Sequence, residues 1–585
     1  MPDIGLLQGP PRPKLVAVPR PVAGTALDPP PIIPVAPIIP VAEEGRDIRI
    51  VAHAGVVSGG APLATLSVAL DETAGEPVNA PVEAPPTRSA ESTATRVIEA
   101  VSDISEPSRT LAGETTPHAP GASPPPVAPR VLPVPPSIPV RDLLWLLLAL
   151  ALIVGTGLGI RDPWPADEPR FASLASDMVR SGEWLFPRVG GDLYQDKPPL
   201  FFWLLAASYT LFGAVKAWFL LPAFLAAAGV LFLVYDFGRR TVSREAGLGA
   251  AIASLCSLQF VLAFRGAQID PVLCLLTTFS LYALLRHLLL GDGWRWYFLG
   301  GFAAGLGIIT KGVGFLPLLL LIPYFALRGF GWHGLAKVDA GRGGWRWWLA
   351  PVAMLLAVSL WFVPMLMAVA ASGSPEYVAY RDEILFKQTV GRYAAAWHHV
   401  KAWYYFLVEV IPPLWLPWSL LLFWLVPHFR AAFRERDARV WLPLCWAMLV
   451  VLFFSVSPGK RGIYILPALP ALALASLPLL PGVFARRGVH IAGFVLGIGF
   501  FVVALAIAIG HAAGARLAVE ALADANLPDA RALYVYLVLC GIGLAIARWR
   551  APLLAWPVAL GSLAVVFSYF IAPAMNGERS GRDFV

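Results

Sequence analysis

Long apolar runs fill residues 141 to 575 of this chain, and each run is about 17 to 25 residues long. A helix of about 20 residues crosses the roughly 30 Å of hydrocarbon in a bilayer. Only helices and closed barrels satisfy every backbone polar group in lipid, and these runs lack the alternating pattern of barrel strands. We therefore predict an all-α polytopic membrane protein. About thirteen transmembrane helices are expected, starting near residues 143, 217, 246, 271, 296, 313, 347, 404, 440, 462, 490, 532 and 552.

Residues 1 to 140 have a different composition, because they contain no Trp, Tyr, Phe or Cys and are rich in Pro, Ala and Val. Such a segment buries too little apolar area to offset the loss of chain entropy on folding. We predict a disordered, partly polyproline-like tail that could recruit cytoplasmic proteins. The alternative is a small folded unit around residues 47 to 70, where the sequence has strand-like pieces.

Basic residues follow every even-numbered predicted span. They are Arg239, Arg240, Arg244, Arg286, Arg295, Arg328, Lys337, Arg342, Arg346, Arg430, Arg434, Arg436, Arg439, Arg486, Arg487, Arg548 and Arg550. Short loops rich in Lys and Arg stay in the cytoplasm, which predicts a cytoplasmic tail and places the odd-numbered loops outside. The net charge of +7 is thereby explained by topology, so we expect no nucleic-acid partner.

The outward loops nevertheless carry charges, and the first of them is the most charged. This loop, predicted over residues 161–216, contains Asp167, Glu168, Arg170, Asp196 and Lys197. A charge at membrane depth costs about 2.5–3.5 kcal/mol on insertion scales, so it is normally paired, solvated or functional. Further outward charges lie in RGAQID (265–270), around Lys311, in the loop 372–403 and in SPGKRGIY (457–464).

A carboxylate beside several cations at the lipid surface suits one kind of chemistry. The carboxylate would deprotonate an acceptor hydroxyl, and the cations would hold a lipid-linked phosphate leaving group. This chemistry is glycosyl transfer from a polyprenyl-phosphate sugar, with inversion at the sugar carbon because one displacement occurs. The competing class is a polytopic transporter or lipid flippase, which would place charges near the midplane between related halves; no internal repeat is evident.

A family resemblance rests on several motifs in consistent order over roughly residues 142 to 575. They are ADEPRFASLASDM, GEWLFPRVGGDLYQDKPPLFFW, a lone Asp270, LGIITKGVGFLPL, an RY…HH…WYYF…PPLWLPW segment and SPGKRGIYILPALPALAL. Together they resemble the GT-C integral-membrane glycosyltransferases, above all the aminoarabinose transferase (ArnT) group and the protein O-mannosyltransferases. The resemblance implies an enzyme of the bacterial inner membrane with a periplasmic active site. It also implies a polyprenyl-phosphate donor, such as an undecaprenyl carrier, and a lipid A, glycan, lipid or protein acceptor, as in lipopolysaccharide modification.

The resemblance also implies roles for individual residues. Asp167 would be the essential carboxylate, with Glu168 beside it and Asp270 as a second active-site acid. The donor phosphate would be bound by Arg170, Lys197, Arg392, Lys460 and Arg461. No cofactor is required, although a divalent metal could be held by Asp196 with His398 or His399; such a set without fixed spacing is a weak signal.

Two points stay open at this stage. Asp167 and Glu168 could simply cap a helix, because acids are favoured in its first turn and Pro169 occupies a permitted position. Family members often continue into a soluble periplasmic domain, whereas residues 576–585 form only a short predicted periplasmic end.

Overall fold

The computed structural model describes residues 49–54, 64–69, 138–213, 218–385, 400–524 and 530–581. The chain divides into two units, Met1–Ala119 and Pro120–Val585. In the first unit, β1 (Arg49–Ala54) pairs antiparallel with β2 (Ala64–Ala69). These strands coincide with the strand-like pieces of the alternative interpretation. The rest of residues 1–137 lies outside the described residues, so both the disorder of the tail and its recruitment of partners stay predictions.

The second unit is helical, with one short two-stranded hairpin. Its first half contains α1 (Val140–Ile153), η1 (Gly155–Gly157), α2 (Glu168–Ser181), β3 (Arg188–Val189), β4 (Asp192–Leu193), α3 (Leu200–Phe212), α5 (Leu221–Thr241), α6 (Arg244–Leu255), α7 (Leu258–Phe264), α8 (Ile269–Leu285), η2 (Arg286–Leu290), α9 (Trp294–Ile308), η3 (Gly312–Leu320) and α10 (Leu321–Gly329).

The second half contains η4 (Arg342–Trp348), α11 (Leu349–Ser372), α12 (Pro375–Asp382), η6 (Phe406–Val410), α14 (Ile411–Leu414), α15 (Trp418–Arg434), α16 (Ala438–Val456), η7 (Gly462–Ile465), α17 (Ala468–Ser476), α18 (Leu480–Phe484), α19 (Arg487–Ala512), α20 (Arg516–Asp524), α21 (Arg531–Arg550), η8 (Pro552–Leu554), α22 (Ala555–Val566), η9 (Phe567–Ile571) and α23 (Ala572–Arg579). The all-α polytopic fold predicted from the apolar runs is confirmed.

The predicted count of thirteen spans is not confirmed. Eight helical segments among the described residues are long and apolar enough to cross a membrane, or ten if α6–α7 and η6–α15 each count as one bent span. Three other predicted spans correspond to α1, α9 and the pair η7–α17, which have only 14 to 15 residues each. At 1.5 Å per residue these reach about 21–23 Å, short of the hydrocarbon thickness.

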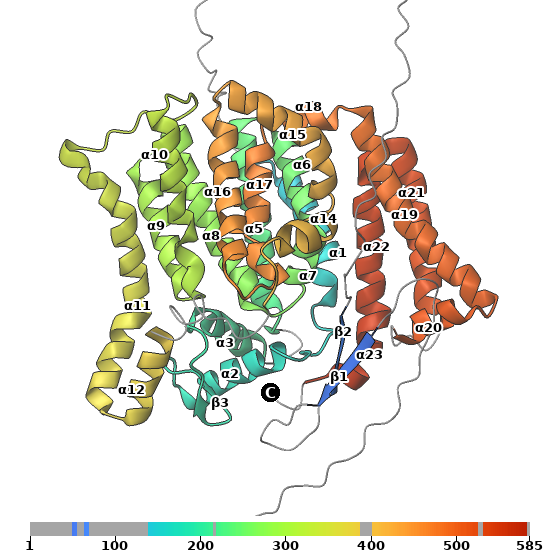
Figure 1. The fold of residues 1–585 in the computed structure, drawn as a ribbon, viewed down its shortest axis with the longest axis horizontal. Helices are drawn as coiled ribbons and strands as arrows, with labels where there is room; N and C mark the ends of the chain where they lie inside the picture. Colours follow the sequence, from blue (N-terminus) through green and yellow to red (C-terminus); the bar gives the residue numbers. More distant parts are fainter. Residues whose placement is uncertain are drawn as a thin grey trace, which may run out of the picture. The chain divides into compact units, whose positions relative to one another are not determined.

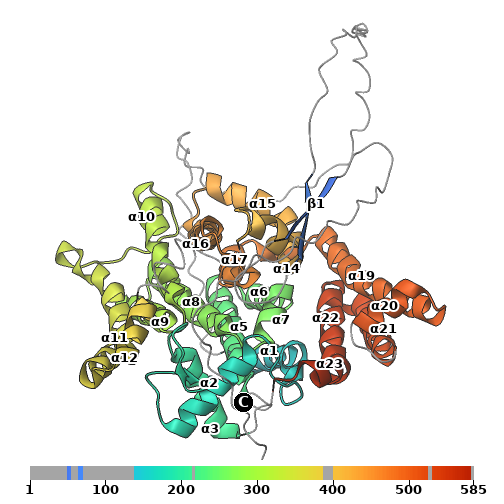
Figure 2. The same ribbon diagram turned by 60° about the horizontal axis from the view of Figure 1, so that its bottom comes forward.

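The long helices lie side by side, and smaller elements gather at their ends (Figure 1). Helices α2, α3, α12 and α23 lie at one end, whereas α18 and the start of α19 lie at the other. The turned view brings α2, α3 and α23 forward together (Figure 2). Because α2 and α3 have 14 and 13 residues, the loop 161–216 holds short helices that do not span.

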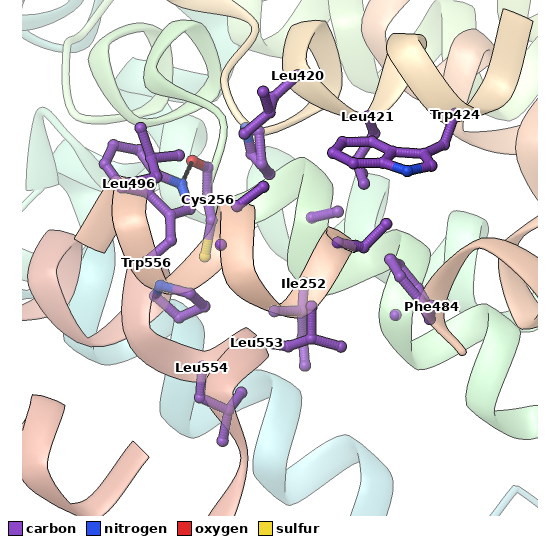
Figure 3. A pocket seen from close by; sticks show the side chains of 17 residues that line it. Ile252, Cys256, Leu420, Leu421, Trp424, Phe484, Leu496, Leu553, Leu554 and Trp556 are labelled. Carbon is purple, nitrogen blue, oxygen red and sulfur yellow. Dashed lines mark hydrogen bonds between the residues drawn. The ribbon is translucent and has the colours of Figure 1, made fainter. Parts of the chain in front are cut away.

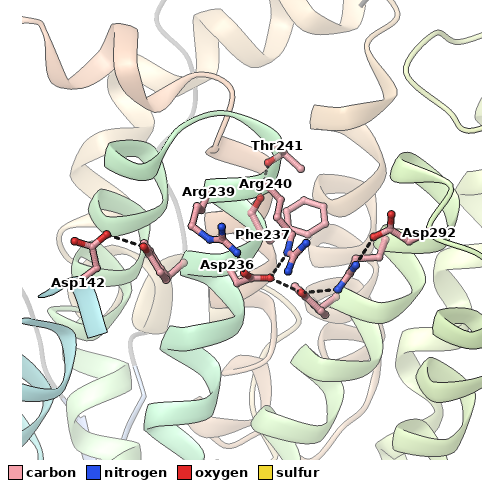
Figure 4. Close-up of polar contacts among 10 residues, drawn as sticks. Asp142, Asp236, Phe237, Arg239, Arg240, Thr241 and Asp292 are labelled. Carbon is pink, nitrogen blue, oxygen red and sulfur yellow. Dashed lines mark hydrogen bonds and ion pairs between the residues drawn. The ribbon is translucent and has the colours of Figure 1, made fainter. Parts of the chain in front are cut away.

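A buried aspartate joins two of the long helices. Asp236 of α5 is only 2% exposed, and it accepts a hydrogen bond of 2.6 Å from Arg239. It also accepts from Arg240 and from the hydroxyl of Tyr282 on α8, as Figure 4 shows. The Tyr282 hydroxyl in turn accepts from Arg286, 3.2 Å away. The carboxylate is therefore satisfied by groups from both helices, as a buried charge must be.

A second buried aspartate joins α1 to α5 and α6. Asp142 is fully buried and accepts from the Tyr235 hydroxyl at 2.6 Å and from Arg244. The short helix α1 thus acquires polar contacts with two neighbours as well as apolar packing.

We expect Asp236→Ala to destabilise the protein strongly, because it leaves Arg239 and Arg240 without their carboxylate. Loss of one partner of a buried pair costs about 3–5 kcal/mol. Thermal unfolding in detergent would measure the change. The matched control is Asp292→Ala, since Asp292 pairs with Arg286 but its side chain is 31% exposed. Equal losses in the two variants would contradict the structural role assigned to Asp236.

Candidate active site

Asp167 directly precedes α2 but does not cap it. Its side chain makes no capping hydrogen bond. Instead, Oδ1 accepts a hydrogen bond of 2.6 Å from Arg170, one turn along α2. The other oxygen, Oδ2, lies 3.7 Å from a guanidinium nitrogen of Arg461. The carboxylate therefore lies between two arginines that are distant in the sequence, and the helix-cap explanation does not account for its contacts.

Asp270 has a cationic partner as well. It lies in the first turn of α8 and accepts a hydrogen bond of 2.7 Å from Lys311. The Lys311 ammonium also lies 4.4 Å from the centre of the Tyr464 ring. Such a contact stabilises a cation over an aromatic face. Asp167 and Asp270, two of the three acids to which the resemblance assigns catalytic roles, are thus each paired with Lys or Arg at helix ends.

One loop contacts Asp167 and also Lys311, the partner of Asp270. The α16–α17 loop (457–465) carries Arg461, which faces Asp167, and Tyr464, which faces Lys311. The two are tied within one turn, since the Tyr464 amide donates to the Arg461 carbonyl at 3.0 Å. Gln259 of α7 donates to the Gly462 carbonyl at 2.6 Å. The loop is therefore fixed to α7 while it contacts Asp167 and Lys311.

Lys460 points away from the carboxylates and into the protein. It is 4% exposed and donates to the backbone carbonyls of Lys401 at 2.9 Å and Ser457 at 2.5 Å. Burial lowers the pKa of this ammonium. These contacts bind the loop to the segment at residue 401, so they favour an anchoring role for Lys460 over the phosphate-binding role that the resemblance implies.

Glu168 is buried and surrounded by donors. Arg161 binds it with both guanidinium nitrogens at 2.7 Å, in a bidentate pair. The backbone amides of Trp164 and Ala267 donate to the same carboxylate at 2.8 and 2.9 Å. Bidentate charge-assisted pairs are among the strongest hydrogen bonds in proteins. A carboxylate with four donors is poorly placed to accept a substrate proton, which favours a positioning role for Glu168.

The turn before α8 carries another arginine, Arg265, which is partly buried. Arg265 donates to the Ile153 carbonyl at 2.7 Å, to the Thr156 hydroxyl at 3.1 Å and to Ser568 of η9. Burial, with a smaller contribution from the nearby Arg161, lowers the pKa of Arg265 to about 10. Arg265 therefore links the end of α1 to the segment before α23.

Helix α23 holds the segment that leads to Asp167. The Asn576 amide oxygen accepts from the Asp162 backbone amide at 3.2 Å and from the Trp164 indole at 3.0 Å. Its amide nitrogen donates to the Ile160 carbonyl at 3.3 Å. Asn576 falls just outside the predicted domain 141–575, and sequence reasoning missed it. Its only sequence signal is a polar side chain directly after an apolar run.

The remaining predicted site residues fall into two groups. Lys197 donates to the Asp196 carbonyl at 2.9 Å, and both lie just before α3. The backbone amide of Leu200, the first residue of α3, donates to the Ile309 carbonyl at 3.1 Å. This bond joins the loop to the segment before Lys311.

Arg392, His398 and His399 lie outside the described residues, so their roles stay predictions. Among the described residues, no group of three His, Cys, Asp or Glu side chains could hold a metal ion.

Comparisons with known proteins agree with the motifs. Residues 196–361 match the family described as dolichyl-phosphate-mannose-protein mannosyltransferase. An undecaprenyl phosphate-alpha-4-amino-4-deoxy-L-arabinose arabinosyl transferase of Shewanella sediminis is 30% identical over 59% of this chain and 61% of its own length. The protein of that name from Pseudomonas aeruginosa PAO1 is 29% identical over 74% of this chain and 75% of its own. The chain thus spans about three-fifths to three-quarters of these relatives.

The solved structures include one with the same fold. ArnT from Cupriavidus metallidurans, in a crystal structure bound to undecaprenyl phosphate, superposes with a TM-score of 0.57 at 23% identity. The match covers 75% of this chain and 78% of that one. The GT-C fold and the resemblance to the ArnT-like family are confirmed.

We expect Asn576→Leu to loosen the segment from Ile160 to Asp167, because it removes three hydrogen bonds at nearly constant volume. Each such bond contributes about 0.5–1.5 kcal/mol. Hydrogen exchange of peptides covering residues 158–168 should become faster. Arg579→Ala is the control, because Arg579 is exposed on the same helix. Exchange as slow as in the unchanged protein would show that α23 does not hold this segment.

Proposed function

We propose that this relative of the ArnT group and of the protein O-mannosyltransferases is itself an inverting glycosyltransferase. It moves a sugar from a polyprenyl-phosphate carrier to a lipid A, glycan, lipid or protein acceptor at the periplasmic face of the inner membrane. The observation that carries the proposal is the carboxylate of Asp167, held between Arg170 and Arg461 at the end of the helix bundle. The names of the curated relatives support an undecaprenyl-phosphate carrier.

The two oxygens of Asp167 are in different environments, and the difference suits a general base. Oδ1 is occupied by Arg170 at 2.6 Å, which orients the carboxylate. Oδ2 is 3.7 Å from Arg461, beyond hydrogen-bond range, so it can accept a proton from an acceptor hydroxyl. That hydroxyl oxygen would form a bond to the anomeric carbon as the bond from this carbon to the phosphate oxygen breaks. The phosphate leaves with the electron pair and needs no acid.

The cations are placed to bind that leaving phosphate. Arg461 has a side chain 44% exposed, so its guanidinium can turn toward a phosphate that enters beside Asp167. Guanidinium groups bind phosphate oxygens in pairs. Lys197 lies in the loop joined to the segment before Lys311. We assign donor binding to Arg461 and Lys197, with Arg392 as a further candidate.

The transporter or flippase is the less favoured function. A transporter would place its charged groups near the midplane, at interrupted helices between repeats. Here Asp167 precedes α2, Asp270 lies in the first turn of α8, and Lys311 directly precedes η3. Charges at helix ends on one face suit a reaction at the membrane surface.

We expect a reporter that is active only outside the cytoplasm to be active when fused after Asp192 and inactive when fused after Arg487. The reason is that basic loops stay in the cytoplasm and α2 lies at the opposite end of the bundle from the α18–α19 junction (Figure 1). The reverse pattern would contradict the periplasmic location of the active site.

We expect Asp167→Asn to lower the transfer rate by about 10²–10⁴-fold while donor binding persists, because the change removes the base and keeps the shape. Lys197→Ala should instead weaken the donor complex, since a cation is needed whenever phosphate is bound. Purified variants would be tested with radiolabelled polyprenyl-phosphate sugars, for equilibrium binding and for transfer.

The matched control for Asp167→Asn is Asp177→Asn on the same helix, which should transfer normally. Loss of donor binding in both Asp167→Asn and Lys197→Ala would indicate that Asp167 holds a phosphate-bridging metal. Transfer at the wild-type rate by Asp167→Asn would contradict the proposed base.

A further inference from the structure

An apolar cavity lies among α6, α15, α18, α19 and the η8–α22 turn, and none of the acids described above lines it (Figure 3). Its volume is about 200 Å³, and its labelled lining residues are Ile252, Cys256, Leu420, Leu421, Trp424, Phe484, Leu496, Leu553, Leu554 and Trp556. An apolar cavity of about 150 Å³ stays dry and can hold a benzene ring. This cavity can therefore hold a hydrocarbon segment of about eight carbons.

The walls of the cavity are mainly apolar. The Trp556 indole donates to the Cys256 carbonyl at 2.9 Å. Phe484 packs against Gly249, where an added Cβ would lie 2.5 Å from the ring. A hydrocarbon chain is therefore the occupant that suits this cavity, since a polar group would find few partners here.

Arginines flank one end of the cavity. Arg486 and Arg487 lie two residues from the lining residues Phe484 and Val489, respectively, and Arg550 lies three residues before Leu553. Three residues of chain span at most about 11 Å, so the backbone of each arginine lies within about that distance of a lining residue.

Arg486, Arg487 and Arg550 give this end of the cavity positive charge that nearby acids do not neutralise. All three are exposed, and within the part of the chain that the structure describes no carboxylate forms an ion pair with them. This end carries an excess of positive charge, which suits an anion.

An apolar cavity flanked by arginines suits a molecule that has both a hydrocarbon chain and an anionic headgroup. Guanidinium groups bind phosphate in a bidentate manner, and Lys or Arg near a membrane surface attracts anionic lipids. We propose that this site binds an anionic glycerophospholipid, with part of one acyl chain in the cavity and the phosphate at Arg486, Arg487 and Arg550.

The proposed lipid site is separate from the candidate active site. The α18–α19 junction, which bears Arg486 and Arg487, and helix α2 lie at opposite ends of the bundle (Figure 1). A polyprenyl carrier with its phosphate near Asp167 would reach this cavity only with the far end of its chain. The two occupants therefore differ in headgroup and in dependence on the arginines.

Native mass spectrometry of the purified, delipidated protein tests the proposal, with phosphatidylglycerol and phosphatidylethanolamine as probes. The unchanged protein should bind phosphatidylglycerol at least tenfold more tightly. The double variant Arg487→Ala/Arg550→Ala should reduce that preference to less than threefold. Gly493→Leu should weaken the binding of both lipids, because the leucine side chain would fill the cavity. The backbone can accept the substitution, since an added Cβ at Gly493 meets only Leu553, at 3.8 Å.

Arg295→Ala is the matched control, because Arg295 is also an exposed arginine but lies on α9, away from the cavity. The contrary result is that the unchanged protein and the three variants bind both lipids equally. That result would show that the lipids bind only as ordinary boundary lipid, and it would overturn the proposal. A polyprenyl phosphate that copurifies with the protein and is lost in Gly493→Leu would overturn the assigned occupant. If Gly493→Leu fails to fold, as judged by monodispersity, the arginine double variant decides. None of these readouts depends on sugar transfer.

Discussion

The bidentate pair between Glu168 and Arg161 is the interaction on which the candidate site depends. It is buried, with side chains 10% and 7% exposed, and it joins segments that would otherwise be independent loops. Through Glu168 the start of α2 is bonded to Trp164 and to Ala267 in the turn before α8. Arg161 also donates to the Arg265 carbonyl at 3.2 Å. A buried pair of this kind is tolerated only when its remaining donors and acceptors are satisfied, and here they are. The position of Asp167, one residue before Glu168, follows from this network.

The sequence predicted the fold class well and the individual spans less well. Apolar run length is a direct consequence of bilayer thickness, so an all-α membrane domain could be expected with little ambiguity. The bends between helices could not be predicted, because the apolarity of a run does not show where it bends. Helices α6 and α7 meet at 66°, and the η6–α14 segment meets α15 at 107°. A continuous apolar run also does not say that α9 stops after 15 residues. A reliable count of spans needs both the positions of the bends and the ends of the helices, so the predicted thirteen was not confirmed.

The candidate site could be predicted where charges break the topological rule, and not where roles depend on partners. Asp270 and Lys311 were both conspicuous as outward charges, but their pairing across 41 residues is visible only in three dimensions. Asp167 and Glu168 are adjacent and chemically alike. Their environments differ, since four hydrogen-bond donors occupy Glu168, whereas Asp167 accepts from Arg170 at 2.6 Å and has Arg461 at 3.7 Å. Asn576 carries no charge, so a search for misplaced charges could not find it.

The α16–α17 loop links the surroundings of the two acids. Arg461 and Tyr464 belong to one hydrogen-bonded turn, so a backbone movement of this turn would shift both the guanidinium near Asp167 and the ring over Lys311. Lys311 holds Asp270, and any change at Tyr464 alters the surroundings of that pair. Lys460 opposes a large movement, because its buried ammonium fixes the start of the turn to two carbonyls. The motion available to the loop is therefore a small rotation of the Arg461 side chain. In the reaction proposed above, such a rotation would leave Oδ2 of Asp167 without its nearby cation when the acceptor proton is taken up.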